Sequence, residues 1–410
     1  FDQTGAGARL QLQCNRKIFG CENYFLTGAS FDWAESYFSS GFYPAAMGAN
    51  YNNILIPGFG FQAQFAVPGF NDFAGLYLTD TFSPTDWFHI TGAMRYNYMQ
   101  VQLGGYGVNP NGSIASTAAL EDFQPITPAA GFTLQPLRAF GIVEPELRDL
   151  TFFFNYSESF RAPMPDELVG ANPLNPVILP MAQIGDPSLS PVYAQTYESG
   201  FRGKLPQEIN WNFAFYRTDL TNQLQFQQTG HSAAGFFANV ADEQNQGVEV
   251  MLQGTHGKFS WFANWSFLEA TFQNSLHLVN TIGPVSVQPG DRRGGLPEQM
   301  VKVGVSCQLT DRWQVSADFQ YYSSSFLYGD YANIYPMVSG WEALNIQTYY
   351  NLTKWCQIYA FATNVMDLHY FNSGLISQNV FTGAPNGGTI EPFLNPGSPF
   401  GVWGGVRFQF

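Results

Sequence analysis

The sequence predicts an all-β fold, namely a transmembrane antiparallel up-and-down β-barrel, on three observations. Aromatic residues make up 17% of the 410 residues and charged residues only 12%, whereas a soluble globular protein has about 25% charged residues. No segment approaches the ~20 consecutive apolar residues of a membrane-spanning helix. Apolar and polar residues instead alternate, which gives each strand one face for lipid and one for a polar lumen.

The alternation is strictest in short segments that read as strands. In residues 313–322, Trp313 and Phe319 share one face while Gln314 and Ser316 share the other. No soluble core would require a face so polar. Three further segments alternate in the same way, at 88–97, 210–215 and 344–351.

The connections between strands fall into two classes, short and long. A barrel of this kind has short turns on the periplasmic side and long loops on the outer side. The predicted turns are 15–20, 83–86, 203–208, 256–258, 310–312 and 352–354, with a longer link at 136–149 on the same side. The predicted loops, rich in Gly, Pro, Asn and Ser, are 36–70, 103–125, 162–191, 228–234, 273–297, 329–339 and 371–399. No linker and no second domain separates these segments.

The number of strands between these connections is roughly fifteen, whereas closed single-chain bacterial barrels have even numbers. Phe410 ends the last strand on the periplasmic side. Counting back through the turns makes the first strand, 6–14, run downward from the outside. Because a complete barrel begins at the periplasm, we expect an odd number of strands, and whatever precedes them, to be absent from this sequence.

Five sets of motifs occur in a fixed order along the chain. They are a strand with Phe-Arg-x-Pro and Glu-Leu in 153–168, Phe-Tyr-Arg-Thr-Asp and Asn-Gln-Leu in 215–224, Asn-Val and Gly-Val-Glu in 239–249, Leu-Pro at 296–297, and Asn-Val-Met-Asp-Leu-His-Tyr in 364–370. Their order and spacing resemble those of TonB-dependent outer-membrane receptors, although Val365-Met366 stands where Leu-Phe is usual in that family.

The resemblance implies a barrel of about 22 strands filled by an N-terminal plug. Residues 1–410 would then be the C-terminal portion of one barrel, with no plug domain and no TonB box within the given sequence. The implied location is the bacterial outer membrane. The implied partners are outer-membrane lipid, a small or medium ligand such as an iron chelate, and the inner-membrane TonB complex, which would act through the plug.

The end of the chain adds a separate indication of this location. Residues 402–410 alternate and finish on the aromatic residue Phe410. This pattern resembles the terminal strand that outer-membrane assembly machinery recognises.

The first two of the four cysteines, Cys14 and Cys21, flank the first predicted turn. We expect a disulfide between them, which would close a small loop and contribute ~2 kcal/mol. Two free thiols are the alternative. Cys307 and Cys356 lie far apart in the sequence, and we expect neither to be catalytic.

Charged residues on the polar faces of the predicted strands are expected to point into the lumen, because Arg or Lys on the lipid face costs ~2 to 4 kcal/mol at the bilayer midplane. Solvation of the lumen and docking of a plug explain them more simply than a substrate path does. These residues are Arg95, Glu198, Arg202, Glu249 and Asp318.

Candidate ligand-binding residues lie in the outer loops and at the upper ends of strands. Aromatic rings offer rigid stacking area and Arg offers a fixed fork of donors, although Tyr and Trp near strand ends also form the ordinary interfacial girdle. The candidates are Phe160, Arg161, Glu167, Tyr328, Asp330, Tyr331, Tyr335 and Trp341.

Other classes of function find no support in the sequence. The net charge of −14 argues against nucleic-acid binding. The five His residues lack metal-ligand spacing, so no metal site or cofactor is expected. No catalytic fingerprint appears, so we do not expect an enzyme.

The resemblance therefore implies a receptor and transporter for TonB-energised uptake of a scarce ligand such as a ferric siderophore. Cobalamin, haem and oligosaccharides are the other ligand classes that it allows. Two different functions stay open, a passive porin-like channel and a structural barrel subunit of a larger envelope complex.

Overall fold

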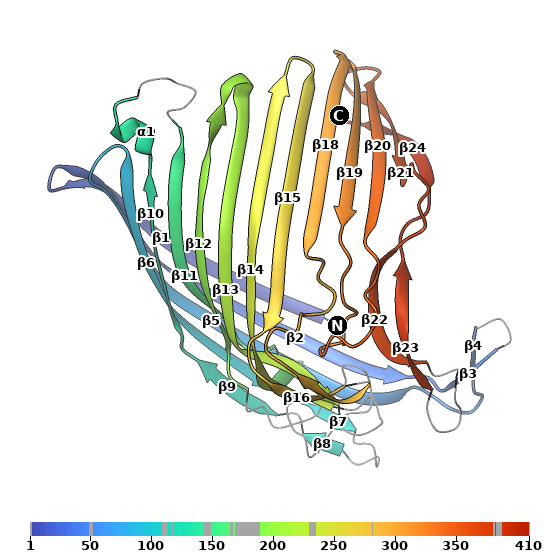
Figure 1. Ribbon diagram of the computed structural model, residues 1–410. Helices are drawn as coiled ribbons and strands as arrows, with labels where there is room; N and C mark the ends of the chain where they lie inside the picture. The colour runs from blue at the N-terminus through green and yellow to red at the C-terminus, as the bar shows by residue number, and fades with distance from the viewer. Residues whose placement is uncertain are drawn as a thin grey trace.

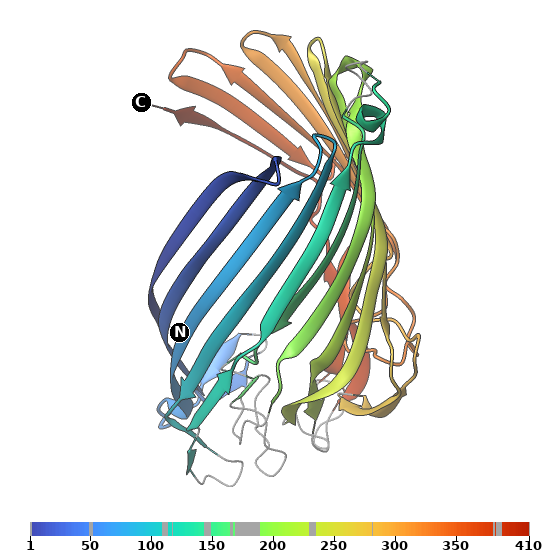
Figure 2. The same ribbon diagram turned by 90° about the vertical axis from the view of Figure 1, so that its left-hand side faces the viewer.

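The computed structural model describes residues 2–48, 52–108, 114–116, 118–142, 149–164, 167–168, 189–228, 235–280, 282–379, 382 and 388–409. One curved antiparallel sheet dominates this part of the chain. The sheet curls, so that the N-terminal strands pass behind the central and C-terminal strands in Figure 1. The same strands appear as tilted neighbours in Figure 2.

The sheet contains eighteen strands in the described residues, of which β7 (Tyr106–Val108), β8 (Ile114–Ser116) and β9 (Ala119–Phe123) are short extensions. The other fifteen form the wall, which confirms the predicted number. They are β1 (Asp2–Ile18), β2 (Cys21–Phe42), β5 (Gln62–Ser83), β6 (Phe88–Leu103), β10 (Ile126–Leu134), β11 (Thr151–Arg161), β12 (Val192–Leu205), β13 (Ile209–Gln228), β14 (Gly235–His256), β15 (Phe259–Phe272), β18 (Gln299–Thr310), β19 (Trp313–Tyr322), β20 (Trp341–Asn351), β21 (Cys356–Thr363) and β24 (Gly401–Phe408).

Each wall strand pairs antiparallel with the next one along the chain. Four of these pairings pass over intervening loop strands, namely β2–β5, β6–β10, β15–β18 and β21–β24. In the described residues, β1 pairs only with β2, and β24 only with β21. With alternating directions and fifteen strands, β1 and β24 run the same way.

The two ends of the wall differ in how the strands are connected. The upper end in Figure 1 carries short turns and the small helices α1 (Pro136–Ala139) and η1 (Pro206–Glu208). The lower end, called the loop end below, carries the long connections. They include the hairpins β3 (Ala45–Met47) with β4 (Asn53–Leu55), β16 (Leu276–Asn280) with β17 (Gly283–Val287), and β22 (Phe371–Asn379) with β23 (Thr389–Pro396).

Several predicted boundaries need correction. The segment 36–70 was expected to be a loop, yet β2 and β5 stay paired out to Phe42 and Gln62. The first turn is Phe19 and Gly20 alone, because β1 continues to Ile18. In both places the strands stay paired beyond the alternating apolar and polar residues, because the backbone N–H and C=O groups still need hydrogen-bond partners. Residues 165–166 and 169–188 of the predicted loop 162–191, residues 229–234 of the predicted loop 228–234, and Phe410 lie outside the described residues.

The register assigns apolar and polar residues to opposite faces of the wall. Val303, Phe319 and Leu344 follow one another across three strands on one face, whereas Gly304, Asp318 and Asn345 do so on the other. A hollow of about 980 Å³ is lined on the polar side by residues from β12 to β20, including Lys204, Gln253, Lys302, Asp318 and Gln347. Side chains from so many strands meet only on the concave side of a sheet, so the polar face is the concave one.

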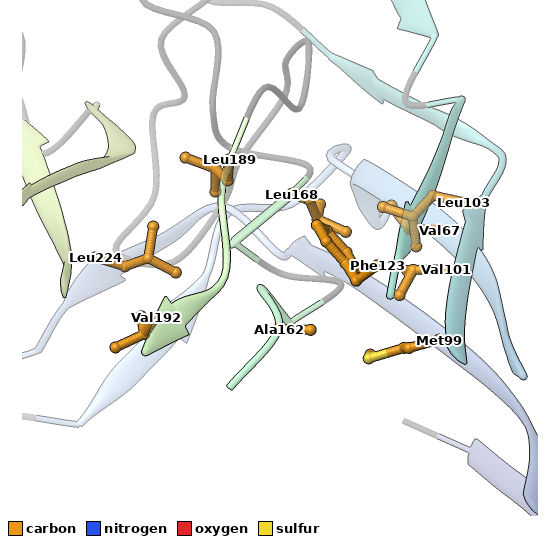
Figure 3. Close-up of a cluster of buried hydrophobic side chains, with 10 residues drawn as sticks. All are labelled: Val67, Met99, Val101, Leu103, Phe123, Ala162, Leu168, Leu189, Val192 and Leu224. Atoms are coloured by element: carbon orange, nitrogen blue, oxygen red, sulfur yellow. The ribbon is translucent and has the colours of Figure 1, made fainter. Parts of the chain in front are cut away.

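The buried apolar clusters gather where loops meet strand ends. The largest combines the ends of β5 and β6 with β9 and the residues that flank the β11–β12 connection, as Figure 3 shows. Its members are Val67, Met99, Val101, Leu103, Phe123, Ala162, Leu168, Leu189, Val192 and Leu224. Among the described residues, no helix has the length and apolar character needed to cross a membrane.

Candidate ligand-binding site

Arg161 and Glu167 form an ion pair at the loop end of β11. Arg161 Nη1 and Nη2 donate to Glu167 Oε2 and Oε1 at 2.7 and 3.0 Å. The backbone N–H of Met164 donates to Glu167 Oε2 at 2.8 Å. The Glu167 side chain is only 7% exposed, whereas that of Arg161 is 41% exposed. The pair therefore closes the Phe-Arg-x-Pro corner on itself, and the Glu167 carboxylate is directed toward the protein.

The residues next to this ion pair also stabilise the fold. Phe160 packs against the large apolar cluster, and Leu168 is fully buried within it, close to Phe123 in Figure 3. Three of the eight predicted ligand residues, Phe160, Arg161 and Glu167, are thus brought together as a folded corner.

Asp330, Tyr331 and Tyr335 shape the connection between β19 and β20. Asp330 is fully buried, and its two carboxylate oxygens accept hydrogen bonds from the backbone N–H groups of Ile334 and Tyr335 at 3.0 and 2.9 Å. Tyr331 packs edge-on against Phe272, with 6.1 Å between ring centroids. Burial is the main reason that the pKa of Tyr331 rises to about 12. Asp330 and Tyr331 therefore hold the loop in shape.

Tyr328 and Trp341 differ in how much of their side chains is exposed. Tyr328 is 61% exposed, and its backbone bonds to β22 through Gly374 and Ile376. Trp341 is stacked between Tyr322 and Tyr370, with centroid distances of 4.4 and 4.8 Å. The faces of the Trp341 ring are therefore occupied by protein, and only its edge remains available.

Three loop connections, at 273–298, 323–340 and 364–400, bond to one another and are called the loop assembly below. Gly295 N–H donates to the carbonyl of Phe326 at 2.7 Å. The Asn333 side chain bonds the backbone of Arg292 in both directions, at 2.6 and 2.8 Å. Arg293 pairs with the buried Glu243 of β14, which also accepts from Gln225 at 3.0 Å. These bonds tie the loop assembly to the wall.

A pocket of about 410 Å³ lies between the three connections of the loop assembly, and it is called the three-loop pocket. Of the residues that line it, the sequence pointed only to Trp341. The others include Tyr322, Ser325, Asn372, Ser373 and Asn395. Ser373 lies opposite Asn395 in the β22–β23 hairpin. Because these two residues are far apart in the sequence, no local pattern could have brought them together.

The five charged residues expected in the lumen share the concave face by register. Arg95 Nη2 donates to Ser30 at 2.8 Å, and Asn345 donates to Asp318 at 2.8 Å. Glu198 accepts from Asn155 at 3.4 Å, and the Arg202 guanidinium lies 5.6 Å from the Phe153 ring centroid. Glu249 lies opposite Ala214 and Ser266. None of the ion pairs recorded in the described residues joins two of the five.

The predicted disulfide between Cys14 and Cys21 is wrong, since both residues are free thiols. In the β1–β2 ladder Cys14 lies opposite Phe25, and Cys21 lies opposite Ile18. The four-residue offset separates the cysteines by about 13 Å at ~3.3 Å per residue, whereas a disulfide needs Cα atoms within about 7 Å. The two cysteines flank the turn but are not close to each other, because the turn is tighter than expected and fixes a register in which they do not pair.

The described residues contain no group of three or more His, Cys, Asp or Glu side chains arranged to hold a metal ion. The three-loop pocket offers amides, hydroxyls and aromatic edges, and the concave face of the wall carries scattered charges. Together with long antiparallel strands whose convex face is apolar, these features define the wall of an outer-membrane β-barrel.

Comparison with known proteins identifies the family. The family model described as "TonB dependent receptor-like, beta-barrel" matches residues 1–365. The chain therefore belongs to the TonB-dependent receptor family, whose members are outer-membrane receptors and transporters and not enzymes. No curated protein matches the sequence.

Solved structures of such receptors share the fold. The ferric-catecholate import receptor Fiu of E. coli K12 aligns with a TM-score of 0.69 and 16% identity over 100% of this chain and 55% of that chain. The siderophore receptor PiuA of Acinetobacter baumannii gives 0.72 and 15%, over 99% and 56%. The copper transporter OprC gives 0.67 and 12%, over 100% and 57%. The chain thus spans little more than half the length of these three proteins.

Proposed function

We propose that this protein serves in the TonB-energised uptake of a scarce ligand, such as a ferric siderophore, across the outer membrane. Its membership of the receptor family over residues 1–365 supports the proposal. The observation that carries it is the loop assembly, whose described residues bond to one another at the loop end of a wall with a polar concave face. Loops bonded together in this way suit selective capture of a ligand better than free diffusion.

The proposal includes partners beyond this chain. Outer-membrane lipid would contact the apolar convex face, and the inner-membrane TonB complex would act through a plug. A small or medium ligand, for which an iron chelate is one class, would bind from the outside. Among the eight predicted ligand residues, we retain two as contacts: Tyr328, because its side chain is 61% exposed, and the edge of Trp341, because it lines the three-loop pocket. The other six take part in the folding of the corner and of the β19–β20 connection.

The proposal also gives a role to the five charged residues that were expected in the lumen. Arg95, Glu198, Arg202, Glu249 and Asp318 lie on the concave face without pairing with one another, so each can hydrogen-bond with water or with a plug. Docking of a plug is the role that we propose for them.

The test is an uptake assay with the natural full-length protein in its own outer membrane. Cells are supplied with an iron(III) siderophore mixture under iron limitation, with and without a functional TonB complex. Energised uptake predicts that accumulation falls to background when either the receptor or TonB is removed.

Two outcomes would contradict the proposal. Steady single-channel conductance of the purified protein, with accumulation that does not depend on TonB, would identify a passive porin-like channel. Stable stoichiometric association with other envelope proteins, without any ligand-dependent change, would identify a structural subunit.

A further inference from the structure

We propose that the three-loop pocket is a binding site for a neutral, hydroxyl-rich ring, that is, a carbohydrate unit of the ligand. The inference rests on the proposed receptor function for its biological setting and adds the chemical class that this site selects. It stands on the lining of the pocket, its hydrogen-bonding groups and its rigidity.

The lining is uncharged. All twelve residues that border the pocket within the described chain are neutral, and Lys302, whose Nζ lies 5.9 Å from the Tyr322 ring centroid, is not one of them. An ionic group entering the pocket would lose hydration without meeting an opposite charge, which is costly. The pocket therefore favours a neutral ligand over an anionic chelate.

The polar groups that line the pocket can both donate and accept hydrogen bonds. Asn372 Oδ1 accepts from Asn395 Nδ2 at 2.8 Å and from the Ser373 hydroxyl at 3.1 Å. No hydrogen bond is recorded in the described chain for Asn372 Nδ2 or Asn395 Oδ1, so the pair offers one donor and one acceptor. Sugar hydroxyls, which donate and accept at the same atom, match such amides and the nearby serines.

Apolar surface completes the match. Pro297, Met300 and Val338 border the pocket together with Tyr322 and the edge of the Trp341 ring. A sugar ring combines hydroxyl groups with patches of C–H surface, and such patches are suited to aliphatic and aromatic side chains. The volume of about 410 Å³ falls within the ordinary range of small-molecule sites.

The pocket is held in shape before any ligand arrives. Ser325 and Val338 exchange two backbone hydrogen bonds, at 3.1 and 2.9 Å. The stack of Tyr322, Trp341 and Tyr370 joins β19 and β20 to the start of the last connection. A preformed site has less ordering entropy to lose on binding, which suits capture of a dilute ligand.

The experiment measures binding by the full-length protein, purified in mild detergent, to an array of neutral oligosaccharides and separately to an iron(III) tris-catecholate complex. We expect a subset of the oligosaccharides to bind. Asn372→Ala and Asn395→Ala should each weaken that binding by up to about tenfold, as expected for the loss of one hydrogen bond. Ser373→Trp should fill the pocket and abolish binding.

The matched control is Ser377→Ala, a serine on β22 that does not border the pocket, which should bind like the wild type. Near-ultraviolet circular dichroism confirms that each variant is folded. The inference is overturned if the wild type binds the ferric complex but no neutral oligosaccharide, if it binds neither, or if the pocket variants bind sugars as well as the wild type does.

Failure of this inference can be told apart from failure of the proposed function. Binding in detergent requires no energy, so pocket-dependent sugar binding combined with TonB-independent accumulation would refute energised uptake alone. TonB-dependent accumulation without sugar binding would refute the carbohydrate site alone.

Discussion

Arg161 and Glu167 were predicted from the sequence as ligand contacts, yet the structure pairs them with each other. The Phe-Arg-x-Pro pattern correctly marked a special corner at the end of β11. The pattern could not show whether the Arg161 guanidinium donates to a ligand or to the Glu167 carboxylate, six residues later. The decisive information is the burial of Glu167, which depends on the apolar cluster around Leu168.

The first prediction concerns the asymmetry of this pair. Arg161→Ala leaves a buried carboxylate with only the Met164 N–H as partner, and should lower the free energy of unfolding by about 1–3 kcal/mol. Glu167→Gln should cost less, because the half-exposed Arg161 can be hydrated and Gln can still accept from Met164. Urea titration of protein folded into lipid vesicles measures both.

The double variant Arg161→Ala, Glu167→Ala serves as the control. It should be more stable than Arg161→Ala alone, because it removes the stranded charge. Equal losses for Arg161→Ala and Glu167→Gln would contradict the assignment of Glu167 as the buried partner.

A second prediction follows from the burial of Tyr331. Its pKa in the folded protein is about 12, because burial, together with Tyr328 and Glu243, disfavours the phenolate more than Arg293 favours it. The unfolded chain ionises near pH 10. The neutral phenol therefore contributes stability that is complete below pH 10 and is lost as the pH rises toward 12.

The corresponding measurement is unfolding free energy against pH from 9 to 12. Wild type should lose on the order of 2–3 kcal/mol more than Tyr331→Phe over this window. Parallel curves for wild type and Tyr331→Phe would show that the phenol is not buried as described.

At the scale of elements, the strands were recognisable from alternation, but their ends were not. Alternation reports only the part of a strand that has lipid on one side and lumen on the other. The β2–β5 ladder continues past that part to Phe42 and Gln62. The same limit hid the β16–β17 and β22–β23 hairpins within segments expected to be loops.

The turn between β1 and β2 gives a third prediction. Phe19 and Gly20 have φ values of 53° and 82°, the left-handed conformation that two-residue hairpin turns require and that Asn-Gly adopts most readily. Phe19→Asn should raise the free energy of unfolding by up to about 1 kcal/mol, and Gly20→Ala should lower it by a similar amount. Vesicle-based urea titration provides the values, and a stabilising Gly20→Ala would contradict the turn geometry.

At the scale of the whole molecule, the curvature of the sheet decides which face is lipid-exposed. Ile346 lies on the convex face of β20, and its neighbour Gln347 borders the concave hollow. The fourth prediction compares the two at nearly equal depth. Ile346→Arg should cost about 2–4 kcal/mol, whereas Gln347→Arg should cost far less because it enters the polar interior. Folding into vesicles measures both, and equal costs would contradict the assignment of faces.

Only part of the candidate site could be predicted from the sequence. Trp341 was identified because an aromatic residue at a strand end is visible in one segment. Asn372, Ser373 and Asn395 were missed because their role arises when a hairpin in the last connection approaches the other two loops. The Cys14–Cys21 disulfide failed for a related reason, since proximity in sequence does not fix the register of a hairpin.

What the sequence alone determined is the barrel wall, with its fifteen strands, its separation of short turns from long loops, and its resemblance to the receptor family. These follow from alternation, which is local and repeats along every strand. Only the tertiary structure decided which loop residues meet, which carboxylates are buried and where a pocket opens. Those properties depend on contacts between segments far apart in the chain, and no local pattern encodes them.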